Sequence, residues 1–235
     1  MAKKLIHTEL GKRFNINDVE HDLSVFIWTF KHADNITYNF NILENLYLSK
    51  GKSNNSELFN KPITIIIVSI IECILVDLLD RVNTATNHLP HNTDKNKMLN
   101  LKNDLQSNYK KKIIKDDFLG DYIVYKRKLY SFKYLINTFK KYNIFDCDSN
   151  NIYDTLSSYG DMRNRVHIEN HHNTLELNEA DVFTNARLKK LEKLFSKVWL
   201  VMTSDFKRPW KGVSPYVKLI YEHQKNTKTT FRFCR

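Results

Sequence analysis

Residues 159–173, YGDMRNRVHIENHHN, hold the side chains best suited to chemistry in this chain. On a helix, Arg163 and His167 are four residues apart and therefore share a face. The arginine guanidinium is a permanent, fork-shaped cation that matches phosphate oxygens. Histidine is the side chain that exchanges a proton near neutral pH. Together they form a minimal set for attack on a phosphodiester.

RNA cleavage is the reaction that this pair would support most simply. RNA supplies its own nucleophile, the 2′-hydroxyl, so the protein need only move protons and stabilise the phosphorane. We expect His167 to act as general acid or base and Arg163 to stabilise the developing charge. Asn164 can orient either group through hydrogen bonds. Cleavage needs one group to remove a proton and another to donate one, and each chain offers one histidine at this site. This predicts a two-fold dimer that brings two such helices together.

Two carboxylates could support this site. Glu72 falls within the apolar face of a predicted helix, where a buried carboxylate needs a partner, and Arg163 is a candidate for that role. The alternative is that Glu72 lies in water at the margin of the helix. For Asp161 a solvated charge is the first interpretation, and orientation of Arg163 is the second.

A basic and aromatic segment, Tyr125–Tyr142, is the predicted RNA-binding surface. Its cations attract phosphates, while its rings either stack on unpaired bases or pack into the core. Arg165 points away from Arg163 on the same helix and can also bind a backbone phosphate. The predicted RNA-binding residues are Arg165, Lys126, Arg127, Lys128 and Lys133.

Two other interpretations of the same residues stay open. Arginine and histidine near a helix C-terminus often only satisfy the last carbonyls and the helix dipole. A metal site built from His167, Glu169, His171 and His172 is a further alternative, but no cysteine or other partner is spaced to complete it. Glycine-rich phosphate loops are missing from the sequence. We therefore predict neither a cofactor nor a metal.

The elements that must position these residues are all predicted to be helices. Only 5 Gly and 4 Pro occur, and the most apolar run, residues 62–79, opens with Pro62, a favoured first helical residue. Glu72 and Asp77 interrupt that run, so a buried helix is expected rather than a membrane span. The predicted fold is an all-α irregular helical bundle. Helices are expected over 15–49, 62–81, 99–112, 121–142, 152–168 and 188–206, with loops at 51–61 and 83–98.

Composition limits the partners and the compartment. The formal net charge of +11 suits nucleic acid or an acidic membrane surface as a partner. A coding sequence rich in A and T also favours lysine, so codon bias is an alternative source of the charge. The 3 Cys have no metal-type spacing, which fits a reducing compartment. The N-terminal lysines are not followed by an apolar segment, so no leader sequence is expected. These features predict a cytoplasmic protein without a membrane anchor.

The segment RNRVHI (163–168), preceded by a long apolar helix with Ser69–Glu72, resembles the HEPN superfamily. The family's signature is an arginine, a polar residue that is often asparagine, and then a histidine. Arg163, Asn164 and His167 match it, with the histidine one residue closer than is usual. The resemblance implies an all-α, dimeric, metal-independent ribonuclease of the kind found in toxin–antitoxin and phage-defence systems, with an antitoxin protein as a possible partner.

The resemblance also divides the chain. Residues 51–235 would form the HEPN-like helical domain, and residues 1–50 an additional N-terminal helical layer packed on it. The alternative function is a non-catalytic HEPN-like protein that binds RNA, a nucleotide or a protein partner. A purely structural helical protein is a third hypothesis.

Overall fold

The computed structural model describes residues 8–16, 22, 32–84, 95–107, 111–114, 122–125, 130–145, 151–165, 178–204 and 206. Within these ranges the chain is predominantly helical, as the sequence predicted. The helices are α1 (Thr8–Phe14), α3 (His32–Lys52), α4 (Asn60–Thr84), α5 (Lys95–Ser107), α6 (Phe132–Lys141), α7 (Asn151–Asn164), α8 (Glu179–Val182) and α9 (Asn185–Ser204), with a 3₁₀ turn, η1, at Ser56–Phe59.

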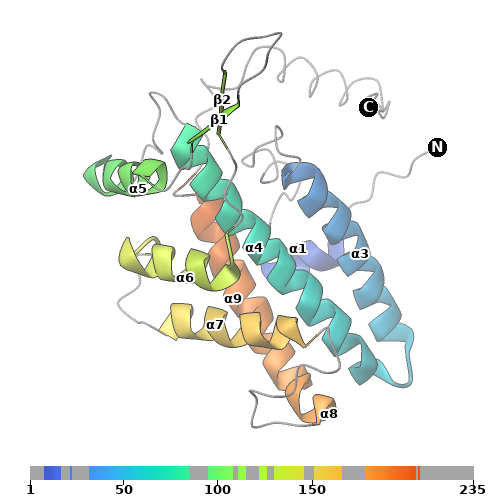
Figure 1. Ribbon diagram of the computed structural model, residues 1–235. Helices are drawn as coiled ribbons and strands as arrows, with labels where there is room; N and C mark the ends of the chain where they lie inside the picture. The colour runs from blue at the N-terminus through green and yellow to red at the C-terminus, as the bar shows by residue number, and fades with distance from the viewer. Residues whose placement is uncertain are drawn as a thin grey trace, which may run out of the picture.

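Helix α4 lies at the centre of the arrangement, with α3 on one side and α6 and α7 on the other (Figure 1). It is apolar on nearly every face, which is the pattern of a helix surrounded by others. Ile67, Ile71 and Leu75 are completely buried. By length and composition α4, together with η1, could also cross a membrane, but core helices meet the same criteria, and most of this one is buried.

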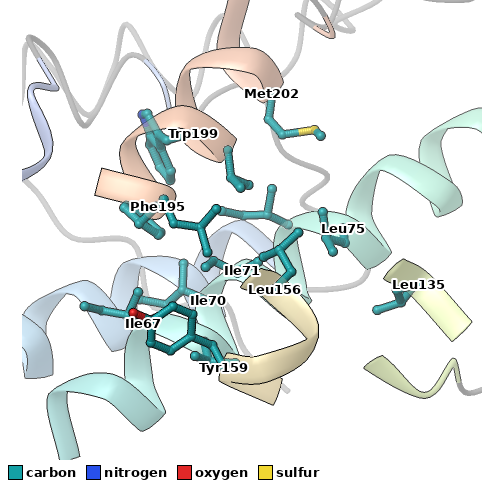
Figure 2. Packing of buried hydrophobic residues seen from close by; sticks show 14 of the residues in the cluster. Ile67, Ile70, Ile71, Leu75, Leu135, Leu156, Tyr159, Phe195, Trp199 and Met202 are labelled. Atoms are coloured by element: carbon teal, nitrogen blue, oxygen red, sulfur yellow. The ribbon is translucent and has the colours of Figure 1, made fainter. Parts of the chain in front are cut away.

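One hydrophobic cluster joins the helices on both sides of α4. Side chains of α4, α7 and α9 meet in this cluster (Figure 2). They include Ile67, Ile70, Ile71 and Leu75 of α4, Leu156 and Tyr159 of α7, and Phe195, Trp199 and Met202 of α9. The same cluster includes residues of α1 and α3, such as Leu10 and Phe40, which are fully buried. The division of the chain at residue 50 stays a prediction, but the two proposed parts share this core.

The helix predicted over 121–142 is wrong in its first half. Residues Tyr122–Tyr125 form a strand, β2, that pairs antiparallel with β1, Lys111–Ile114. The local sequence YIVY is rich in β-branched and aromatic residues, which favour a strand over a helix. Helix α6 begins only at Phe132, where the Ser131 hydroxyl accepts a hydrogen bond from the Tyr134 amide at 3.2 Å.

The β1 strand also corrects the helix predicted over 99–112. Helix α5 begins earlier, at Lys95, and ends at Ser107, so Lys111 and Lys112 belong to the hairpin. The other predicted helices agree more closely with the structure. Helix α7 begins at Asn151, one residue before the predicted start, but it ends at Asn164 and Arg165 follows in a turn, so it is shorter than the predicted helix over 152–168. The described part of the last long helix, α9, ends at Ser204.

Candidate functional site

Arg163 lies in the last turn of α7 and reaches across to the central helix. Its Nη1 donates a hydrogen bond to Oε2 of Glu72 on α4, and the two groups form an ion pair. The side chains keep 25% and 23% of their surface exposed, respectively. The structure thus brings together the arginine and the carboxylate that the sequence suggested as partners.

Two more residues hold the Arg163 guanidinium. It lies over the Phe132 ring of α6, 5.7 Å from the ring centroid, a distance at which the ring face attracts a cation. Its Nη2 also donates to the Asn164 side-chain oxygen at 3.4 Å. The guanidinium is therefore held by a carboxylate, a ring face and an amide, and part of it remains accessible to solvent.

Gly160 makes the contact between Phe132 and α7 possible. A Cβ at this position would lie 2.5 Å from Cδ1 and 2.9 Å from Cε1 of the Phe132 ring. Phe132 is only 6% exposed, so its ring has little room to move. The close approach of α6 to α7, one turn before Arg163, therefore requires glycine. Sequence reasoning missed both residues; a glycine within a predicted helix, three residues before the arginine, was the available signal.

The electrostatics of Glu72 reflect its partial burial. Desolvation raises the pKa of its carboxyl above the ordinary value, and the attraction and hydrogen bond of Arg163 lower it again by less. Burial therefore disfavours the charged form of Glu72 more than the attraction of Arg163 favours it. Glu72 restrains the guanidinium and also compensates part of its charge.

Tyr159 anchors the same end of α7 to α9. Its hydroxyl donates a hydrogen bond to the Arg187 carbonyl oxygen at 2.7 Å, and burial raises the pKa of the phenol to about 12. The phenol is therefore a hydrogen-bond donor at neutral pH. With Tyr159 bound to α9 and Arg163 bound to α4, the last two turns of α7 are held between two long helices.

The structure corrects the prediction for Arg165. This residue follows the end of α7 in a turn, its amide donates to the Met162 carbonyl at 3.2 Å, and only 3% of it is exposed. A buried guanidinium is not accessible to an RNA phosphate. Asp161, by contrast, is exposed, and the side-chain bonds of Arg163 go to Glu72 and Asn164. The position of Asp161 therefore agrees with a solvated charge rather than with orientation of Arg163.

Several predicted site residues lie outside the described ranges. His167 follows the described end of α7, and Lys126, Arg127 and Lys128 precede α6. Of the four residues of the basic segment that were predicted to bind RNA, the structure describes Lys133, which is exposed on α6. The residues considered as alternative metal ligands also lie outside the described ranges, namely His167, Glu169, His171 and His172. Across the described ranges, no three histidine, cysteine or acidic side chains gather as a metal site would require.

Comparison with known proteins places the chain in no established family. No family model matches the sequence. No curated protein and no solved structure is significantly similar to it. The function must therefore be argued from the residues themselves.

Proposed function

We propose that this protein is a metal-independent endoribonuclease resembling the HEPN superfamily, with a helical bundle of that type as its core. The observation that supports it best is the restraint of Arg163 at the end of α7, where the guanidinium is held by Glu72 and Phe132 yet stays 25% exposed. A positioned, accessible cation is what a phosphorane needs, because stabilisation of developing charge is usually the largest catalytic contribution.

In this proposal His167 transfers the protons. It would remove the proton of the 2′-hydroxyl or protonate the leaving 5′-oxygen, and a second copy of the chain in a dimer would supply the other transfer. Asn164, already bonded to Arg163, would orient the site. A cytoplasmic toxin or anti-phage effector, restrained by an antitoxin protein, is the biological role that the resemblance implies.

The decisive experiment compares RNA cleavage by purified variants. Arg163→Ala and His167→Ala are each expected to slow cleavage by roughly 100-fold or more, with circular dichroism and oligomeric state unchanged and no effect of EDTA. Lys12→Ala is a control that also removes one cation, since Lys12 is exposed on α1, outside the predicted RNA-binding segment, and lies 3.9 Å from Glu9. Cleavage at the wild-type rate by either site variant would disprove the proposal.

A non-catalytic RNA-binding protein is the second candidate. The compensation of Arg163 by Glu72 favours it, because a cation that already has a counter-ion stabilises a phosphorane less strongly than a free one. The short spacing from Arg163 to His167 points the same way. Salt-sensitive binding of RNA without any cleavage product, by wild-type protein, would select this candidate.

A further inference from the structure

Helix α9 presents a solvent face that carries only basic charge. Lys189, Lys190, Lys193 and Lys197 are all exposed and recur at spacings of three and four residues, so they lie along one side of the helix. We call these four residues the lysine stripe. At about 1.5 Å per residue the stripe is roughly 12 Å long. Within the described ranges, no carboxylate pairs with any of the four lysines.

The only acidic residue of α9 is bound by two other helices. Glu192 accepts a hydrogen bond from the Tyr47 hydroxyl at 2.7 Å and lies 3.7 Å from Nη1 of Arg13. It is therefore paired with α1 and α3 on the inner side of the helix. This separation of charge leaves the outer side of α9 without local compensation, which differs from the mixed-charge pattern of an ordinary solvated helix.

We propose that the lysine stripe binds the phosphate backbone of single-stranded RNA, independently of base sequence. Lysines gathered along one side of a helix are suited to a charged polymer, because each lysine acts as a point charge that displaces counterions from phosphate. The choice of RNA rests on the proposed function. Without it, the charge pattern alone identifies only a polyanionic backbone.

The position of the stripe connects it to the candidate site. Tyr159 of α7, one turn before Arg163, donates its hydroxyl hydrogen bond to the backbone of Arg187. Arg187 precedes the first lysine of the stripe by two residues, so the stripe begins beside the helix that carries Arg163. RNA held along α9 would therefore lead toward the end of α7.

A lipid surface is a poorer fit for this face. Helices that bind membranes insert an apolar side between the headgroups. The apolar side of α9, which includes Leu191, Phe195 and Trp199, is buried in the protein core, with at most 2% of each of these residues exposed. Leu200, at 65%, is the only exposed large apolar residue of α9. The helix thus offers cations without a surface that could insert.

The test replaces the four lysines of the stripe with glutamine and measures binding of labelled single-stranded 2′-O-methyl RNA, which lacks the nucleophile for cleavage. The matched control replaces four lysines outside both the stripe and the predicted RNA-binding segment, which changes the net charge equally. Lys12 lies 3.9 Å from Glu9, and Lys97 donates a hydrogen bond to the Asn143 carbonyl oxygen at 2.6 Å. The control lysines are Lys12 and Lys52, which are exposed, and Lys97 and Lys102, which are half-buried.

The stripe variant should bind at least tenfold more weakly at about 0.1 M salt. The slope of log K against log salt concentration should fall by roughly 2 to 3, because each single-strand phosphate contact contributes about 0.7. The control variant should keep most of the wild-type slope. Equal losses in both variants would overturn the inference, as would stripe-dependent binding to anionic lipid vesicles by a protein that does not bind RNA.

The nuclease proposal can fail separately. If wild-type protein binds 2′-O-methyl RNA through the stripe but leaves unmodified RNA uncleaved, the stripe is supported and the nuclease is refuted. If wild-type protein cleaves RNA, and the stripe variant retains the wild-type KM and salt slope, the stripe is refuted and the nuclease is supported.

Discussion

At the scale of single residues, the arrangement around Arg163 depends on a missing side chain. Gly160 allows the Phe132 ring to lie against α7, and that ring then supports the guanidinium from α6. Neither residue carries charge or a reactive group. Both nevertheless determine where a catalytic or phosphate-binding cation would sit.

Replacing Gly160 with alanine tests this dependence. Alanine in a helix is favoured over glycine by about 1 kcal/mol, but overpacking against a confined ring costs about 1–3 kcal/mol. We expect Gly160→Ala to lower the free energy of unfolding by about 1 kcal/mol in urea titrations. Gly51→Ala is the control, because a Cβ there meets nothing within 4 Å, and it should be neutral or stabilising. A stabilised Gly160→Ala variant would show that the ring moves aside easily.

The raised pKa of Glu72 gives a pH-dependent prediction. The folded protein holds the proton of this carboxyl more tightly than the unfolded chain does, because burial outweighs the attraction of Arg163. Stability contributed by the protonated form is complete below the ordinary glutamate pKa, near ~4.3, and is lost as the pH rises through the raised value. Glu72→Gln removes this loss, so its stability relative to wild type should increase between about pH 4 and pH 7. Unfolding in urea at several pH values measures the difference, and a constant or decreasing difference would contradict the assignment.

How much of the site could be predicted from sequence depends on the kind of contact. The pairing of Arg163 with Glu72 was predictable, because an acidic residue on an apolar helix face needs a cation. The support from Phe132 was not, since it joins two helices whose relative position no local pattern defines. Arg165 was misplaced because its direction was taken from a continuing helix, whereas α7 ends at Asn164 and the chain turns.

At the scale of elements, composition identified the helices that are unambiguously apolar or amphipathic, and failed where a short segment suits two structures. The β-branched run at 63–68 of helix α4 would also suit a strand, but the length and continuity of the apolar segment favoured a helix, which the structure confirms. The segment YIVY is too short to show a helical period, and its pairing with β1 depends on a strand located 8 residues earlier in the chain. The β propensity of such a segment is therefore decisive only together with its contacts to another element.

The docking of α1 on α3 is also a contact that sequence could not indicate. The Glu44 carboxylate of α3 is 4% exposed and accepts hydrogen bonds from the Glu9 and Leu10 amides of α1, each at 3.2 Å. A side chain of one helix thus satisfies the free amides at the start of another.

Removing this carboxylate should release α1 in particular. Glu44→Ala is expected to cost about 1–2 kcal/mol, the range for loss of a helix cap. Hydrogen exchange of the α1 amides should accelerate accordingly, while exchange in α7 changes less. Asn45→Ala is the control, because Asn45 is exposed on the same helix and its side chain bonds only within that helix, to Asn41. Equal protection of α1 in both variants would rule out the capping role.

At the scale of the whole molecule, helices before and after the predicted boundary at residue 50 share one hydrophobic core. Phe40 of α3 is fully buried and contacts the rings of Trp199 and Phe195 of α9, with centroids 5.2 and 6.1 Å away. Those residues belong to the cluster that also includes α4 and α7. Residues on both sides of the predicted boundary at residue 50 therefore contribute to the same buried core.

This sharing predicts cooperative unfolding. Phe40→Ala should destabilise the protein by about 3–5 kcal/mol, the usual cost of removing a buried phenylalanine. Because the core is common, the slowest-exchanging amides of α6 and α7 should lose protection by the same free energy as those of α3. Tyr38→Ala, at a position of α3 that is 68% exposed, should leave all of them nearly unchanged. If the loss after Phe40→Ala were confined to α1 and α3, the first 50 residues would be an independent layer, because α4 and its neighbours would then remain folded without them.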